Sequence, residues 1–149
     1  MGTRSLTIMK EAFNKTAPVE EIAVLYRQYD GHLESHGQEL AEFLAPFTIV
    51  NGIGLTEKRK IANEGSCLAA QIVAHFKTDV GGFYLHPAGT RDADEEFRYT
   101  VLAIPGDPIW LKAEEGYGSE WTTRFEGTPQ AYLAWLKENK DHLYGEDSG

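Results

Sequence analysis

The residue types best suited to chemistry gather in one polar run, residues 26–37, which reads YRQYDGHLESHG. Arg27 can grip a phosphate or a carboxylate through two parallel hydrogen bonds. Asp30 can hold a nearby histidine in one tautomer, and His32 and His36 follow within the same run. One arginine, one aspartate and two histidines so close together predict a binding site for a small anionic ligand.

The elements around this run also favour anion binding. Residues 21–29 (EIAVLYRQY) alternate in polarity and predict a strand that ends near Arg27. Ser35 and Gln38 have the spacing of a capping box, so we expect a helix to begin at Ser35–Gly37. The free amides and the dipole at a helix N-terminus attract anions, which places Gly37 in the predicted site.

A second arginine is expected at the same end of the sheet. Residues 5–9 alternate like a short strand, and an antiparallel hairpin with residues 21–29 would bring Arg4 close to Arg27. We therefore predict a binding site and no catalytic or metal-ligating residues. The predicted ligand-binding residues are Arg4, Tyr26, Arg27, Asp30, His32, His36 and Gly37.

Two other interpretations of this run remain open. In the simpler one, Arg27 and Asp30 stabilise a tight turn and the two histidines are exposed loop residues. In the other, Asp30 and His36 form the acid–base pair of a small hydrolase. The His32/His36 spacing does not match the His-Glu-x-x-His zinc motif, and the chain contains no Walker loop, dinucleotide fingerprint or Gly-x-Ser-x-Gly elbow. We therefore expect no cofactor.

The net charge of the chain limits the classes of partner that it can bind. Its 14 basic and 23 acidic residues give a formal net charge of −9, which disfavours broad nucleic-acid binding. An acidic surface suits a basic protein partner instead, so a module that inhibits a host protein is an alternative function. One cysteine, Cys67, fits a reducing compartment, and no apolar run is long enough to cross a membrane. We expect a cytoplasmic protein, and a sheet edge that could support a homo-oligomer.

The pattern of elements predicts one α+β domain over residues 1–149, with an acidic tail frayed from about residue 144. The expected order is β-β-α-α-β-β-β-β-α, a mainly antiparallel sheet with helices on one face. The second helix spans residues 63–77, and Thr128-Pro129 starts the last one. The four C-terminal strands, at residues 83–86, 96–104, 109–113 and 120–126, are expected to form an antiparallel meander.

Several segments resemble a family of small, uncharacterised phage and prokaryotic proteins. They are the start GTRSLT, the segment YRQYDG, the stretch HGQELAEFL, and residues 62–63 and 67–71. This resemblance covers about the N-terminal half of the chain and brings no established activity. Small phage proteins often act against host defences, either by sequestering a signalling nucleotide or by binding a defence protein. The resemblance therefore implies a counter-defence role, with a nucleotide, including a cyclic one, as the small anionic ligand.

Overall fold

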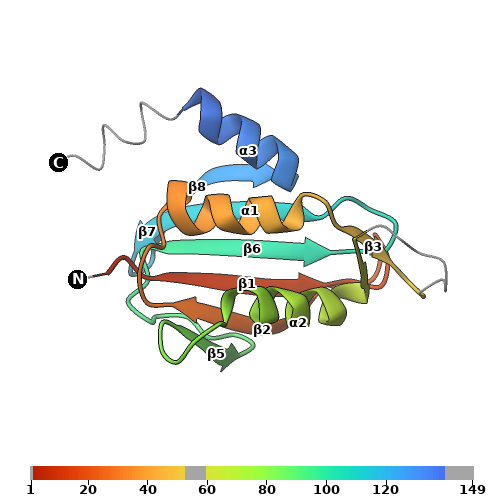
Figure 1. Ribbon diagram of the computed structural model, residues 1–149, viewed down its shortest axis with the longest axis horizontal. Helices are drawn as coiled ribbons and strands as arrows, with labels where there is room; N and C mark the ends of the chain where they lie inside the picture. Colours follow the sequence, from red (N-terminus) through yellow and green to blue (C-terminus); the bar gives the residue numbers. More distant parts are fainter. Residues whose placement is uncertain (1, 53–59, 140–149) are drawn as a thin grey trace.

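Six strands form one mostly antiparallel sheet in the computed structural model, which describes residues 2–52 and 60–139 (Figure 1). The strand order is β5-β2-β1-β6-β7-β8, and the central pair, β1 and β6, is parallel. The strands are β1 (Ser5–Glu11), β2 (Glu20–Arg27), β5 (Phe83–Pro87), β6 (Phe97–Ala103), β7 (Trp110–Tyr117) and β8 (Glu120–Gly127). Two further strands, β3 (Thr48–Val50) and β4 (Ile61–Asn63), form a separate parallel pair.

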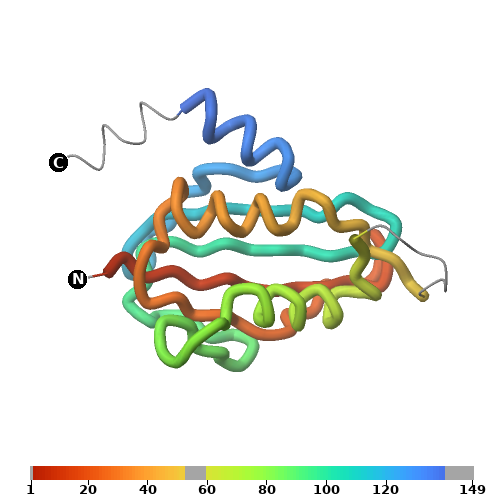
Figure 2. The backbone as a smooth tube through the Cα atoms, in the orientation of Figure 1, coloured from red at the N-terminus to blue at the C-terminus, as the bar shows by residue number. Residues whose placement is uncertain are grey.

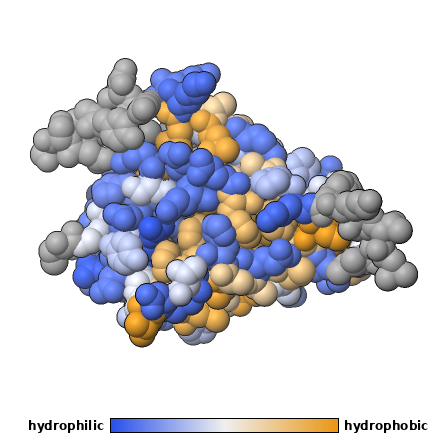
Figure 3. All heavy atoms as spheres, in the orientation of Figure 1, coloured by the Kyte–Doolittle hydropathy of each residue, from blue (hydrophilic) through white to orange (hydrophobic). Residues whose placement is uncertain are grey.

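Helices α1 (Gln38–Leu44) and α2 (Glu64–Phe76) lie across one face of the sheet, and α3 (Pro129–Glu138) lies beside β8 (Figure 1). A π-helical turn, η1 (Leu33–Gly37), leads directly into α1. On this face, hydrophobic residues lie in the strip between α1 and α2, and hydrophilic residues flank it (Figure 3). No helix among the described residues is long and apolar enough to span a bilayer.

The main core lies between the helices and the sheet. Strand β6 shows the reason, because its buried and half-buried side chains alternate along its whole length. Tyr99 is fully buried, and Val101 is 1% exposed. These side chains pack with Leu40 of α1, Ile72 of α2 and Tyr132 of α3 in one cluster. The apolar positions at helical spacing in the sequence are therefore the ones that cover the sheet.

The opposite face of the sheet has its own small core. Leu6, Ile8 and Val24 are at most 2% exposed, and they pack with Ala93. Ala93 belongs to the segment between β5 and β6, which has to cross β2 and β1 because β6 lies on the far side of that pair. Burial on both faces explains why residues 5–9 of β1 are all buried.

The α+β class and the mostly antiparallel sheet are confirmed, and three details of the expected order are wrong. Residues 48–50 and 61–63 form short strands that were not expected. The strand at residues 83–87 pairs with β2 at the sheet edge rather than joining the C-terminal meander, which consists of β6, β7 and β8. Alternation identifies a strand and its buried face, but it does not select the strand's partner. The acidic tail expected from about residue 144 lies outside the described residues.

The predicted capping box is wrong, because Ser35 lies inside η1 and no side chain caps either η1 or α1. Two buried tyrosines hold this backbone instead. The Tyr99 hydroxyl donates to the Gly31 carbonyl, and the Tyr132 hydroxyl donates to the Leu33 carbonyl, each at 2.6 Å. The prediction for α3 is confirmed, since the Thr128 hydroxyl accepts a hydrogen bond from the Ala131 amide.

Edge strand β5 has few free backbone hydrogen-bonding groups with which a further strand could pair. Its register with β2 directs the backbone polar groups of Phe83, Leu85 and Pro87 outward. Lys77 Nζ donates to the Phe83 carbonyl at 2.9 Å, and the Phe83 amide donates to the Gly81 carbonyl. Pro87 has no amide hydrogen, and its carbonyl accepts from Thr90. Leu85 is thus the outward position of β5 whose backbone groups stay available, which disfavours edge-to-edge pairing.

Candidate functional site

Arg27 is the centre of a buried polar cluster at the end of β2. It is 6% exposed, and its Nη1 donates to His36 Nδ1 at 3.1 Å and to Glu39 Oε2 at 2.5 Å. These two bonds tie β2 to η1 and to the first turn of α1. A buried guanidinium needs a carboxylate partner to offset the loss of its hydration, and Glu39 supplies it.

His36 is fully buried, and its tautomer follows from its partners. Arginine can only donate, so Nδ1 must be the acceptor and the ring proton must lie on Nε2. Nε2 then donates to Thr7 Oγ1 at 2.7 Å. Burial, reinforced by the positive charge of Arg27, lowers the pKa of His36 to about 3. His36 is therefore a neutral imidazole that connects β1, β2 and η1.

This arrangement makes His36 unsuited to acid–base catalysis. Both ring nitrogens are engaged, and the ring lies against Phe76 and Tyr99, with centroids 4.9 Å and 5.2 Å away. The Asp30 side chain is 66% exposed and approaches Arg27 Nη2 at 4.0 Å. The hydrogen bond between Asp30 and His36 joins their backbones. The hydrolase interpretation finds no acid–base pair in this geometry.

One edge of the Arg27 guanidinium keeps unused donors. Nε is buried and has no hydrogen-bond partner, and the 4.0 Å between Nη2 and Asp30 is too long for a hydrogen bond. The Tyr29 and Phe83 rings lie beside the guanidinium, with centroids 5.4 Å and 5.0 Å from Cζ. Nε and Nη2 form one of the forks through which an arginine binds carboxylate or phosphate oxygens in pairs. Because Nε is buried, Nη2 is the donor of this edge that an oxyanion in the pocket can meet.

A pocket of about 230 Å³ opens at this position. Arg27 and Glu39 supply its charged groups, and the end of α2, the turn after it and the start of β5 supply the rest. The lining residues are Arg27, Glu39, His75, Phe76, Thr78 and Phe83. The His75 and Phe76 rings stand at 82° to each other and the Phe76 and Phe83 rings at 32°, so the aromatic wall is angled, and it adjoins the Arg27–Glu39 ion pair. The volume suits a small ligand, or the buried part of a larger one.

The structure places the remaining predicted residues as follows. His32 Nε2 lies 3.1 Å from Thr3 Oγ1, which holds the loop before η1 against the N-terminal residues, as the tube in Figure 2 also shows. Gly37 lies against the Tyr132 hydroxyl, so it provides clearance for the core. Tyr26 packs with Tyr84 and His86 on the face opposite Arg27.

Arg4 comes directly before β1, and its carbonyl accepts a hydrogen bond from the Glu96 amide. Among the described residues, the contacts of the Arg27 cluster do not include Arg4. The structure thus brings Arg27 together with His36 and, at longer range, with Asp30. It does not bring Arg4 or Tyr26 to that group.

Sequence reasoning missed most of the pocket. Glu39 had one usable signal, because a buried arginine requires a carboxylate and Glu39 lies in the first turn of the expected helix. His75, Phe76, Thr78 and Phe83 are far from Arg27 in the sequence and carry no motif. They reach the pocket only because β5 pairs with β2 and α2 ends above that pair.

Comparison of the chain with protein-family models, with curated proteins and with solved structures found no match in any of the three. The argument about function therefore depends on the geometry of the chain itself.

Proposed function

We propose that this protein binds a small ligand that carries an oxyanion and a planar ring, such as a nucleotide, in the Arg27 pocket. The observation that carries the proposal is Nη2 of Arg27, which lies too far from Asp30 for a hydrogen bond, beside a pocket lined by aromatic rings. The phosphate accepts a charge-assisted hydrogen bond from Nη2. The base stacks on the ring of Phe83 or His75.

The charges around Arg27 favour a ligand with one negative charge. Glu39 already accepts from Nη1 and helps to hold the guanidinium in place. Asp30 lies at 4.0 Å with an exposed side chain, so it can swing into solvent when a ligand oxygen takes its place. Arg27 and Glu39 together carry no net charge, so a ligand with one negative charge, such as a cyclic nucleotide, is repelled less than a ligand with several. The resemblance to phage proteins agrees with such a ligand, and sequestering a host signal would be the counter-defence role.

The first test replaces Arg27 by lysine, which keeps the charge and removes the two-donor fork. We expect calorimetry with a panel of linear and cyclic nucleotides to give saturable heat with the native chain. Affinity should fall about tenfold to a hundredfold in Arg27→Lys, since a hydrogen bond to a charged group contributes roughly 1.5–3 kcal/mol. The matched control is Arg124→Lys, an ion-paired arginine on β8, which should bind as the native chain does.

A second variant separates ligand binding from the integrity of the buried cluster. Thr78 lines the pocket and is exposed, so Thr78→Trp should fill the pocket without disturbing the core. We expect an unchanged melting temperature and lost binding. Binding that survives both Arg27→Lys and Thr78→Trp, or no saturable heat with any nucleotide, would refute the proposal.

A further inference from the structure

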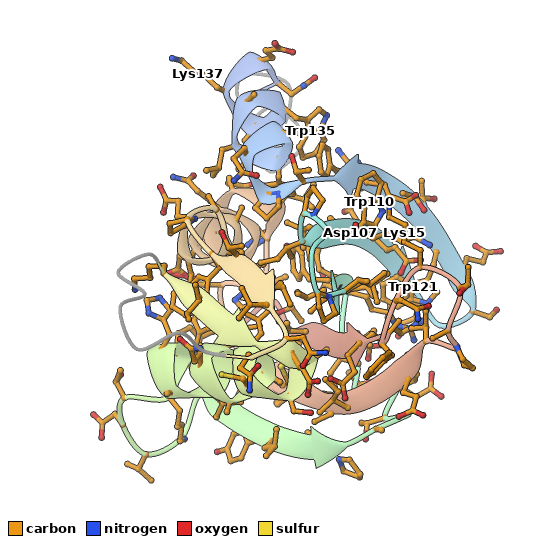
Figure 4. The ribbon with its side chains drawn as sticks, turned by 90° about the vertical axis from the view of Figure 1, so that its right-hand side faces the viewer. Lys15, Asp107, Trp110, Trp121, Trp135 and Lys137 are labelled. Atoms are coloured by element: carbon orange, nitrogen blue, oxygen red, sulfur yellow. The ribbon has the colours of Figure 1, made fainter. Side chains whose placement is uncertain are left out.

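The end of the molecule opposite the Arg27 pocket carries two neighbouring hollows. Strand β1 begins beside Arg27 and ends at this far side, which faces the viewer in Figure 4. The loops at residues 12–19 and 104–109 contribute to both hollows. The first, of about 270 Å³, is lined by Glu11, Ala12, Phe13, Ala17, Pro18, Glu20, Glu64 and Pro105. The second, of about 400 Å³, is lined by Lys15, Leu102, Ile104, Asp107, Pro108 and Trp110.

Large apolar side chains are exposed around these hollows. Phe13 is 69% exposed, Val19 51% and Trp110 43%. The Trp110 indole Nε1 donates to Glu126 Oε2 at 3.0 Å, which fixes the ring in place. Exposed aromatic residues gathered at two hollows are typical of a protein-binding surface, where tryptophan contributes strongly to affinity.

The charges of the two hollows differ. Among the residues that the structure describes, three carboxylates and no basic side chain line the first hollow. In the second hollow, Lys15 Nζ lies 3.6 Å from Asp107 Oδ1, so those two charges offset each other. Glu11 and Glu20 are directly opposite each other in the antiparallel β1–β2 pair. Like charges at such positions destabilise a sheet, and a bound cation would relieve the repulsion.

We propose that this end of the molecule binds a basic, partly apolar peptide segment of a partner protein. An arginine or lysine side chain enters the first hollow, where its charged group meets the carboxylates of Glu20 and Glu64 and the ring of Phe13. Its aliphatic stem packs against Pro18 and Pro105. An aliphatic side chain of the same segment fills the second hollow beside Trp110. A second copy of this chain is disfavoured, because both copies carry the same net charge of −9.

The test uses nuclear magnetic resonance of the whole chain with the peptide acetyl-Leu-Arg-Leu-Arg-amide. We expect millimolar binding, with shifts at the amides of residues 12–17 and 19 and at the Trp110 indole. The same peptide with citrulline in place of arginine keeps the shape and removes the charge, and it should bind at least tenfold more weakly. Equal binding of the two peptides, or no shifts at this end with millimolar arginine peptide, would overturn the proposal.

Three variants test where the peptide binds and whether a loss of affinity comes from unfolding. Glu20→Lys places a lysine opposite Glu11, so this variant should be slightly more stable than the native chain while its peptide affinity falls about tenfold. Trp110→Ser should weaken binding through the second hollow. Glu120→Lys makes the same charge change at the opposite end of β7–β8 and should leave affinity unchanged. If Glu120→Lys weakens binding as much as Glu20→Lys does, net charge alone explains the affinity and the proposed site is wrong.

Discussion

Replacing Gly37 by alanine is expected to destabilise the fold by about 3 kcal/mol or more, which would shift the urea midpoint strongly downward. A Cβ atom at residue 37 would lie 2.1 Å from the Tyr132 hydroxyl oxygen and 2.9 Å from Tyr99 Cε1. Both tyrosines are fully buried and hydrogen-bonded to the backbone before α1, so neither ring can move away without breaking a bond. The glycine is required for close packing, since its φ lies in the ordinary helical region.

A double-mutant cycle with Tyr132→Phe checks this cause. Removing the hydroxyl takes away the 2.1 Å contact and also the hydrogen bond to the Leu33 carbonyl. We therefore expect Gly37→Ala to cost less in the Tyr132→Phe background, with a coupling of about 1 kcal/mol. The rescue should be partial because the contact with Tyr99 remains. Full additivity of the two substitutions would show that the Tyr132 hydroxyl is not what residue 37 encounters.

The sequence predicted the elements better than their connections. Alternation in residues 96–104 and helical spacing in residues 63–77 are local properties, and β6 and α2 lie where those patterns placed them. Ser35 shows the opposite case. Its spacing to Gln38 matched a capping box, yet Tyr99 and Tyr132 set the backbone there from 60 to 100 residues away. Tertiary hydrogen bonds to a backbone carbonyl leave no mark in the local pattern.

In the candidate site, too, the sequence predicted one part and missed another. Arg27 and His36 are near each other in the sequence, and they do meet in the fold. From the sequence alone, both residues are interpreted as polar groups available to a ligand. The sequence pattern does not show how deeply a side chain at a strand end is buried. In the structure His36 is fully buried, whereas Arg27, although only 6% exposed, lines a pocket. The proposed binding therefore depends on Arg27, and His36 holds Arg27 in place.

Acid is expected to destabilise the protein well above the pH at which its carboxylates titrate. The folded pKa of His36 is about 3, whereas an unfolded histidine titrates near its ordinary value of 6.5. Below pH 6.5 the unfolded chain therefore binds a proton that the folded chain does not, and stability falls as the pH falls. The slope from this one group is about 1.4 kcal/mol per pH unit, and the whole loss by pH 3 is about 5 kcal/mol. Such a loss is comparable to the total stability of many domains.

Urea unfolding between pH 6.5 and pH 4.5 measures this slope, and the Glu21 carboxyl, whose pKa Arg91 lowers, adds the same contribution to the native chain and to the variants below. In His36→Gln, an amide can still accept from Arg27 and donate to Thr7, but it takes up no proton in this range. This variant should be less stable than the native chain at pH 7.5. Its free energy of unfolding should also fall less steeply with decreasing pH, by about 1.4 kcal/mol per pH unit, which is the contribution of one proton. His86→Gln removes a half-buried histidine on β5 and should keep the native slope. An unchanged slope in His36→Gln would mean that His36 is not the group that resists protonation. The His36 ring would then be more accessible to water than its buried cluster with Arg27 and Thr7 allows.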